Sequence, residues 1–246
     1  MSTMLKILLI FICLLTALFL YSYKTNHGRG IWYPYVARLY KESLNSRLDQ
    51  FSDPVKDRLL KDFESKGISY PPKKMSFVAL KQEKRFELWC ANSKEDRFTF
   101  IKSYNFTGFS GVIGPKLQEG DRQIPEGFYK IKSLNPNSSY HLSLEVNYPN
   151  SFDLKHAKNE GRANPGSLIY IHGKNVTIGC IPLGDQAIEE IFVLSALVQL
   201  KNIDLIISPK DFRLDSSFSD LSLDKNWLEQ LYKELSSVLK SKYVKK

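Results

Sequence analysis

The middle of the chain carries a series of short stretches that are rich in aromatic and β-branched residues and are separated by polar turns. Such residues pack well on a pleated surface, so the pattern predicts β-strands. The stretches lie at 76–80, 85–90, 98–104, 127–134, 140–146, 167–171 and 203–208. A chain built from so many short strands is expected to fold as a mostly β body of the α+β class.

Helical periodicity flanks this β body on both sides. From about Trp32 to Lys66, apolar residues recur at three- and four-residue steps, which predicts amphipathic helices. Asp53 and Pro54 read as an N-cap followed by proline at the first helical position, so we expect a second helix to begin there. Two further amphipathic helices are expected, one from about 185 to 200 and one at the C-terminus from about 224 to 240.

The N-terminus contains an almost uninterrupted apolar stretch from Leu5 to Tyr23. Its length is close to the ~20 residues that a membrane-spanning helix needs. A cleaved signal peptide is the alternative, but residues 20–23 offer no small-residue cleavage site. We therefore expect an uncleaved anchor in the inner membrane, and an exported body in the cell envelope or periplasm under either interpretation.

Composition limits the classes of partner. The 246 residues are 43% hydrophobic, which is enough for one core or a core with a small appendage. The net charge of +9 favours attraction to anionic surfaces. Its lysines and arginines are scattered, and the sequence has neither zinc-finger spacing nor an aromatic RNA-binding signature, so we expect no nucleic-acid partner.

One segment holds a candidate nucleophile and its base. His172 ends an apolar strand, and the short loop "GKNVTIG" leads from it to Cys180. A cysteine attacks as its thiolate, which requires a nearby base or positive field. The alternative is a packed cysteine near a hydrogen-bonded histidine with no catalytic role. A metal site is not favoured, because no Cys-x-x-Cys or His-x-x-x-His spacing is present.

A second stretch, "GPKLQEGDRQIPEGFYKI" from Gly114 to Ile131, favours the catalytic interpretation of Cys180 over the packed cysteine. Together with the segment around Cys180, it resembles the L,D-transpeptidase catalytic domain of bacterial cell-wall enzymes, the YkuD-like family, and most closely its YafK-like branch. The matching positions are Gly120, Asp121, Pro125, Glu126, Gly127 and Tyr129, followed by His172, Gly173, Thr177, Gly179 and Cys180. The resemblance covers about Lys74 to Pro209.

The resemblance implies a β-sandwich catalytic domain that acts on the stem peptides of peptidoglycan without a metal or an organic cofactor. Cys180 would be the nucleophile and His172 the general base and then acid, with the carbonyl of Gly173 orienting the imidazole. The amides of Gly179 and Cys180 would form the oxyanion hole, and Thr177 would bond to the loop or to the substrate. The resulting thioester would be resolved by an amine, which cross-links, or by water, which cleaves.

Departures from the family pattern affect how substrate is held. A second histidine often precedes the Gly-Cys pair, and here Ile178 stands there; an arginine often follows the cysteine, and here Pro182 does. We therefore expect hydrolysis of wall linkages over cross-linking. The expected partners are peptidoglycan stem peptides, with a wall-linked protein as a further candidate. The rival is a non-catalytic peptidoglycan-binding protein that retains the fold. A papain-like peptidase is disfavoured, because its cysteine would precede its histidine.

These patterns predict an order of segments along the chain. Residues 1–24 form the anchor or signal segment, and 25–73 a helical stalk or support. Residues 74–209 form the L,D-transpeptidase-like catalytic domain, and 210–246 the C-terminal amphipathic helix.

Overall fold

The structure is a computed structural model, and it describes Met4, Leu5, Ile12, Thr16 and residues 41–93, 97–221 and 223–244. The chain divides into two units, Met1–Ser43 and Leu44–Lys246. The predicted anchor and the predicted helix before residue 41 therefore lie almost entirely outside the described residues. Among the residues that are described, no helix has the length and apolar character needed to cross a membrane.

The first helix of the larger unit, α3 (Leu44–Ser65), is continuous and contains Pro54 in its interior. The prediction that a new helix begins at Asp53 was therefore wrong. Proline removes one backbone hydrogen bond and crowds the preceding turn. The helix nevertheless continues, because Phe51, Val55, Leu59 and Phe63 form one buried stripe that spans the proline, and tertiary packing supplies most helix stability in proteins.

The strands form one mixed sheet. They are β1 (Lys74–Leu80), β2 (Arg85–Ala91), β3 (Thr99–Asn105), β4 (Gly127–Ser138), β5 (His141–Val146), β6 (Tyr170–His172), β7 (Ile181–Pro182) and β8 (Ile203–Ser208). Their order across the sheet is β3-β2-β1-β8-β4-β5-β6-β7. The parallel pairs are β1 with β8 and β6 with β7.

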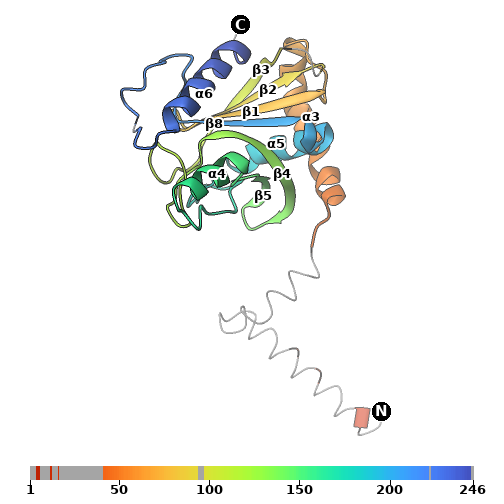
Figure 1. The fold of residues 1–246 in the computed structure, drawn as a ribbon. Helices are drawn as coiled ribbons and strands as arrows, with labels where there is room; N and C mark the ends of the chain where they lie inside the picture. The colour runs from red at the N-terminus through yellow and green to blue at the C-terminus, as the bar shows by residue number, and fades with distance from the viewer. Residues whose placement is uncertain are drawn as a thin grey trace. The chain divides into compact units, whose positions relative to one another are not determined.

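Strand β4 joins the two halves of the sheet. Residues 127–130 pair with β8, whereas residues from Ile131 onward pair with β5. The register shifts between Ile131 and Ser133, and such irregularities bend and twist a strand. Figure 1 shows β4 curling from the upper half of the sheet toward β5. The expected sandwich is thus one curled sheet, and the predicted mostly β, α+β class is confirmed.

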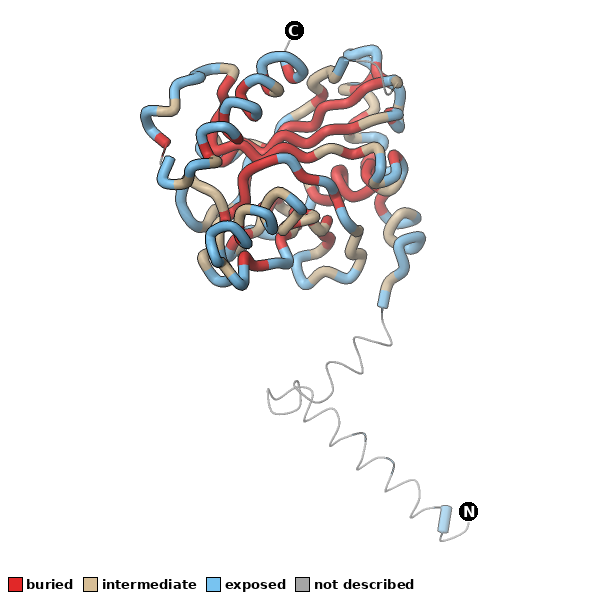
Figure 2. The backbone as a smooth tube through the Cα atoms, in the orientation of Figure 1, coloured by how far each residue is buried: buried red, intermediate tan, exposed pale blue. Residues whose placement is uncertain are grey.

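Two apolar cores lie on the sheet. The larger contains the buried faces of α3 and α5 (Asp185–Val198). The smaller lies beneath α6 (Leu228–Lys242), where Leu231, Leu235 and Leu239 pack against strand residues. Figure 2 shows the strands of this unit as largely buried. Helix α3, the sheet and α6 belong to the same unit. The predicted boundaries at residues 73 and 209 stay a proposal.

Some short elements were not anticipated. Helix α4 (Ser151–Asn159) has a full capping box, in which the Asn150 side chain accepts from the amides of Phe152 and Asp153 and the Asp153 side chain accepts from the Asn150 amide. A 3-10 turn, η1 (Leu200–Asn202), precedes β8. Helix α6 begins at Leu228, four residues later than the sequence suggested.

Candidate active site

His172 lies at the end of β6, where it pairs with Ser143 of β5 and Pro182 of β7. Its side chain is buried, with 1% exposure. Nδ1 lies 2.6 Å from the carbonyl oxygen of Gly173. Because a carbonyl only accepts, Nδ1 carries the proton and Nε2 is left as the basic nitrogen. Nε2 has no hydrogen-bond partner in the part of the chain that the structure describes.

Two features keep this imidazole in place. The ring of Tyr140 covers it, with a centroid separation of 4.6 Å and an interplanar angle of 34°. Gly173 allows the following turn, since a Cβ there would lie 2.7 Å from the Tyr140 carbonyl oxygen. Burial lowers the pKa of His172 below its ordinary value, although the bond to Gly173 acts in the opposite direction. The imidazole is therefore neutral near pH 7, as a general base requires.

Cys180 immediately precedes β7, and its side chain is half-buried. The thiol accepts from the amide of Tyr170 at 3.4 Å and donates to the carbonyl of Leu168 at 3.9 Å. Burial raises the pKa of Cys180, while the Tyr170 amide and the charge of Lys116 lower it. The raised pKa of Cys180 and the lowered pKa of His172 favour a neutral thiol and a neutral imidazole at rest. No hydrogen bond joins the two side chains among the described residues.

Thr177 organises the loop before the cysteine. Its hydroxyl oxygen accepts from the amide of Cys180 at 2.9 Å and from the amide of Gly179 at 3.3 Å, and it donates to the Cys180 carbonyl at 2.8 Å. Both amides that were predicted to bind an oxyanion thus contact this hydroxyl in the resting structure. Their role as an oxyanion hole stays a prediction, and it requires the oxyanion to share or replace the Thr177 contact.

The other stretch of the resemblance, residues 114–131, forms a loop around Asp121 and enters β4 at Gly127. Its carboxylate accepts from the amides of Leu117, Gln118 and Gln123 at 2.8–3.0 Å and from Lys116 Nζ at 2.7 Å. Burial raises the pKa of Asp121, but these bonds outweigh it and hold the pKa below its ordinary value. Asp121 therefore stabilises the loop as a charged acceptor rather than as an acid.

A buried ion pair anchors the end of the same loop. Lys81 and Glu126 are fully buried, and Lys81 Nζ lies 2.7 Å from Glu126 Oε1. Lys81 also donates to the carbonyls of Gly114 and Ile124, while Glu126 accepts from the Tyr232 hydroxyl of α6 at 2.6 Å. Burial lowers the pKa of Lys81, and Glu126 opposes that effect. The pair thereby links β1, the loop and α6.

The structure brings the loop and the cysteine together. Gly179 adopts φ +126°, and a Cβ there would lie 3.2 Å from the carbonyl oxygen of Gln123. Lys116 passes close to Gly166, where a Cβ would lie 2.6 Å from Lys116 Cε. Glycine at both positions therefore permits the close approach of the segments. The charge of Lys116 consequently acts on the Cys180 thiol.

Sequence reasoning found His172, Gly173, Thr177, Gly179 and Cys180, which the structure places in one contiguous region. It did not identify Tyr140, Tyr170 or Lys116 as neighbours of the site. These residues reach it through strand pairing and loop packing, so no local signal reveals them. In the described part of the chain, no group of three or more His, Cys, Asp or Glu side chains is arranged to hold a metal ion.

Both cysteines of the larger unit are free. Cys90 lies on β2 and is fully buried, and burial raises the pKa of its thiol well above the ordinary value. A disulfide between the two would consume the candidate nucleophile, and none is present.

Comparison with known proteins gives several similarities. YafK of Escherichia coli, named as an L,D-transpeptidase, is 34% identical over 122 residues; the match covers 48% of this chain and 46% of YafK, about half of its length. Among solved structures, the helical cell shape determining protein Pgp2 of Campylobacter jejuni aligns over 78% of this chain and 79% of its own, with 21% identity and a TM-score of 0.44. Bd1075 of Bdellovibrio bacteriovorus aligns over 70% and 58%, with 18% identity and a TM-score of 0.41.

The sequence of this chain also matches a protein family directly. The YkuD family, described as the L,D-transpeptidase catalytic domain, matches residues 71–199. That span includes β1 through α5, and with them the loop around Asp121, His172 and Cys180. The chain therefore belongs to the L,D-transpeptidase catalytic domain family.

Proposed function

We propose that this protein is a cysteine-dependent enzyme that acts on the stem peptides of peptidoglycan through a thioester at Cys180. The observation that carries the proposal is the pairing of β6 with β7 in a chain that belongs to this family: His172 ends β6, and Cys180 immediately precedes β7. The basic nitrogen of a neutral imidazole and a half-buried thiol are thus held on neighbouring backbone segments. Such a pair suits nucleophilic acyl transfer.

The reaction follows from these groups. The Cys180 thiol passes its proton to His172 Nε2 as sulfur attacks the carbonyl of a diamino-acid residue in the stem peptide. The tetrahedral intermediate collapses when its C–N bond breaks, and His172 returns the proton to the leaving amine. A second nucleophile, water or an amine, then attacks the thioester and restores the thiol. The Gly173 carbonyl stabilises the imidazolium, because it accepts from Nδ1 throughout.

We propose that water, rather than an amine acceptor, resolves the thioester. An acceptor peptide requires polar groups that hold its carboxylates close to the thioester. Ile178 is 77% exposed beside the cysteine and offers no such contact, and Pro182 is buried in β7. Lys174 already donates to the Ser139 carbonyl at 2.7 Å. The two positions next to Cys180 where family members often carry a polar side chain therefore offer none to the carboxylate of an acceptor peptide.

The test is competition between acceptors on a defined stem-peptide donor. We expect the product formed from water to dominate when a labelled D-amino acid is added at modest concentration. Efficient incorporation of the label, faster than hydrolysis, would establish cross-linking instead. If neither product forms and Cys180 resists an acylating probe, the result would support the non-catalytic alternative.

We further propose that the protein is exported and works in the cell envelope, attached to the inner membrane by residues 5–23. The long apolar stretch without a small-residue cleavage site supports this proposal. Membrane fractionation followed by N-terminal sequencing tests it. A soluble product that begins near Lys24 would contradict the anchor.

A further inference from the structure

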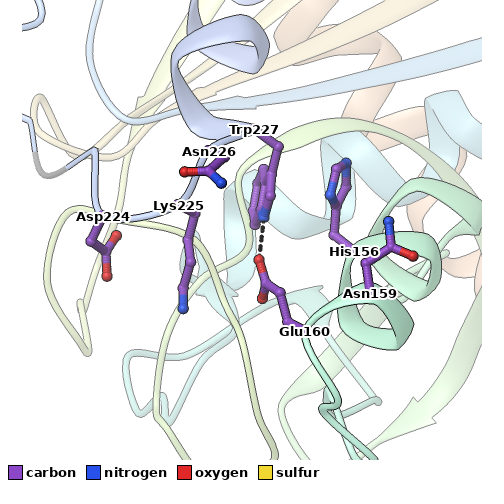
Figure 3. A pocket seen from close by; sticks show the side chains of 7 residues that line it. All are labelled: His156, Asn159, Glu160, Asp224, Lys225, Asn226 and Trp227. Atoms are coloured by element: carbon purple, nitrogen blue, oxygen red, sulfur yellow. Dashed lines mark hydrogen bonds between the residues drawn. The ribbon is translucent and has the colours of Figure 1, made fainter.

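A hollow of about 470 Å³ lies between the C-terminal end of α4 and the segment that precedes α6 (Figure 3). It is separate from the residues assigned above to catalysis. Its lining combines one indole ring with amide, carboxylate, imidazole and ammonium groups. The lining residues are His156, Asn159, Glu160, Asp224, Lys225, Asn226 and Trp227.

The indole ring of Trp227 is held rigidly. It stacks on His156, with centroids 4.7 Å apart and planes at 28°, and it meets the edge of Phe152 at 5.6 Å. Its Nε1 donates to Glu160 Oε1 at 2.6 Å. In Figure 3 the ring stands between the His156 and Lys225 side chains. Because the ring is already held in place by these contacts, ligand binding does not carry the entropy cost of ordering it.

The polar groups around the ring indicate the kind of ligand. Asn159 and Asn226 each supply donors and an acceptor, while Asp224 and Glu160 supply acceptors. Two carboxylates face one lysine, and burial lowers the pKa of His156, so the hollow has no excess of positive charge for a phosphate. A neutral ligand with hydroxyl and amide groups and one apolar face matches this set.

We propose that this hollow binds an N-acetylated sugar of the glycan strand. The C–H face of a pyranose ring would lie on the indole, whose π face is weakly negative. The acetamido group and the hydroxyls would exchange hydrogen bonds with the asparagine amides and the Asp224 carboxylate. This inference rests on the proposed function, since it assigns the glycan end of the same substrate.

A continuous set of contacts leads from the hollow toward Cys180. Glu160 accepts from Arg162 Nε at 2.7 Å, and Arg162 Nη1 donates to the Leu117 carbonyl at 2.7 Å. A second hollow, of about 360 Å³, lies here and is lined by Gln118, Glu119, Arg162, Ala163 and Asn164.

From this second hollow the chain continues to Leu168, whose carbonyl accepts from the Cys180 thiol. Residues 164–168 span at most about 14 Å, the length of a short extended peptide. An extended peptide of similar length could therefore reach from the second hollow to Cys180.

The first experiment measures sugar binding by the full chain, without catalysis. The indole N–H resonance of Trp227 is identified as the one missing in Trp227→Phe, and it is followed during titration with triacetylchitotriose. We expect a saturable shift that maltotriose, which lacks acetamido groups, does not produce. No shift up to the solubility limit, or an equal shift with maltotriose, would overturn the proposal.

Two exposed variants provide a matched pair. Asn226→Ala removes a lining amide, whereas Lys158→Ala changes an exposed residue of α4 outside the hollow. We expect the first to weaken chitotriose binding about tenfold, as loss of a hydrogen bond does, and the second to leave binding unchanged. Equal affinity in both variants would contradict the assignment of this hollow.

The second experiment compares donors with and without a sugar. We expect Asn226→Ala to slow turnover of a glycan-bearing muropeptide while a sugar-free stem peptide is processed at the wild-type rate. Equal effects on both donors would overturn the glycan site. If the wild-type protein turns over neither donor but Trp227 still responds to chitotriose, the proposed function fails and the sugar site stands.

Discussion

The two sequence stretches that define this site differ in how their polar groups are satisfied. In the loop around Asp121, every charged group that organises the backbone has several partners: Asp121 accepts from three amides and Lys116, and Glu126 is bonded to Lys81 and Tyr232. In the His172–Cys180 segment, the basic nitrogen has no partner among the described residues and the thiol has only long contacts.

This difference distinguishes residues that stabilise the fold from residues that take part in the reaction. Groups whose hydrogen bonds are complete stabilise one conformation, and their loss leaves buried partners unsatisfied. A general base must instead be free to accept a proton, and a nucleophile must be free to bond to the carbonyl carbon of the substrate. Substitutions in the Asp121 loop should therefore lower stability first, whereas substitutions in the His172–Cys180 segment should lower activity while stability is largely kept.

Among substitutions that keep the nucleophile, the largest effect is expected at His172. His172→Ala removes the acceptor for the thiol proton, so turnover of a stem-peptide donor should fall by about 10³–10⁴-fold, the upper range for loss of a general base. Measurement of initial rates together with thermal unfolding separates catalysis from folding. Turnover within a few fold of wild type would show that a group other than His172 accepts the thiol proton.

Glu126→Ala should instead act on stability. It leaves the Lys81 ammonium buried without its counter-ion, so the free energy of unfolding should fall by about 3–5 kcal/mol in urea titrations. The double variant Lys81→Met, Glu126→Leu is the control, because it removes both charges and should recover much of the loss. A single variant as stable as wild type would mean that the pair does not anchor the loop.

Lys116→Met tests the electrostatic link between the two stretches. The positive charge lowers the pKa of Cys180, so its removal should raise that pKa further. Because alkylation by iodoacetamide requires the thiolate, the midpoint of its rate-versus-pH curve should move to higher pH. Lys174→Met, which changes a lysine bonded to the Ser139 carbonyl, should leave the midpoint in place. Equal midpoints for Lys116→Met and Lys174→Met would show that the charge of Lys116 does not lower the pKa of Cys180.

The smallest effect is expected at Tyr140, whose ring covers His172. Tyr140→Ala admits water to the imidazole and relieves the burial that lowers the pKa of His172, so that pKa should rise toward its ordinary value. The acid limb of the pH–activity profile, which follows deprotonation of the base, should shift to higher pH. Tyr140→Phe keeps the ring and should keep the wild-type profile; a shift there would implicate the hydroxyl instead.

The comparison also shows what sequence could reveal. Strands β1, β2, β5 and β8 were predicted nearly to the residue, because alternation and β-branched content are local signals. The residues His172 and Cys180 were identified by motif. Continuation of α3 through Pro54 was missed, since it depends on a buried stripe against the sheet.

Other features could not be predicted from the local sequence, for similar reasons. Strand β7 has only two residues and exists through its pairing with β6. Contacts of Tyr140 and Lys116 with the site depend on loops that meet in space. The capping box of α4 is the exception, because Asn150 and Asp153 carry its signal in the local sequence at the expected spacing.

The most direct test of the central claim is the detection of the thioester itself. The full chain is mixed with a stem-peptide donor, quenched in acid within the first turnover, and its intact mass and peptide map are recorded. We expect one acyl group on Cys180, none on the buried Cys90, and none in Cys180→Ala. Turnover of the donor without any adduct on Cys180, or continued turnover by Cys180→Ala, would contradict the account.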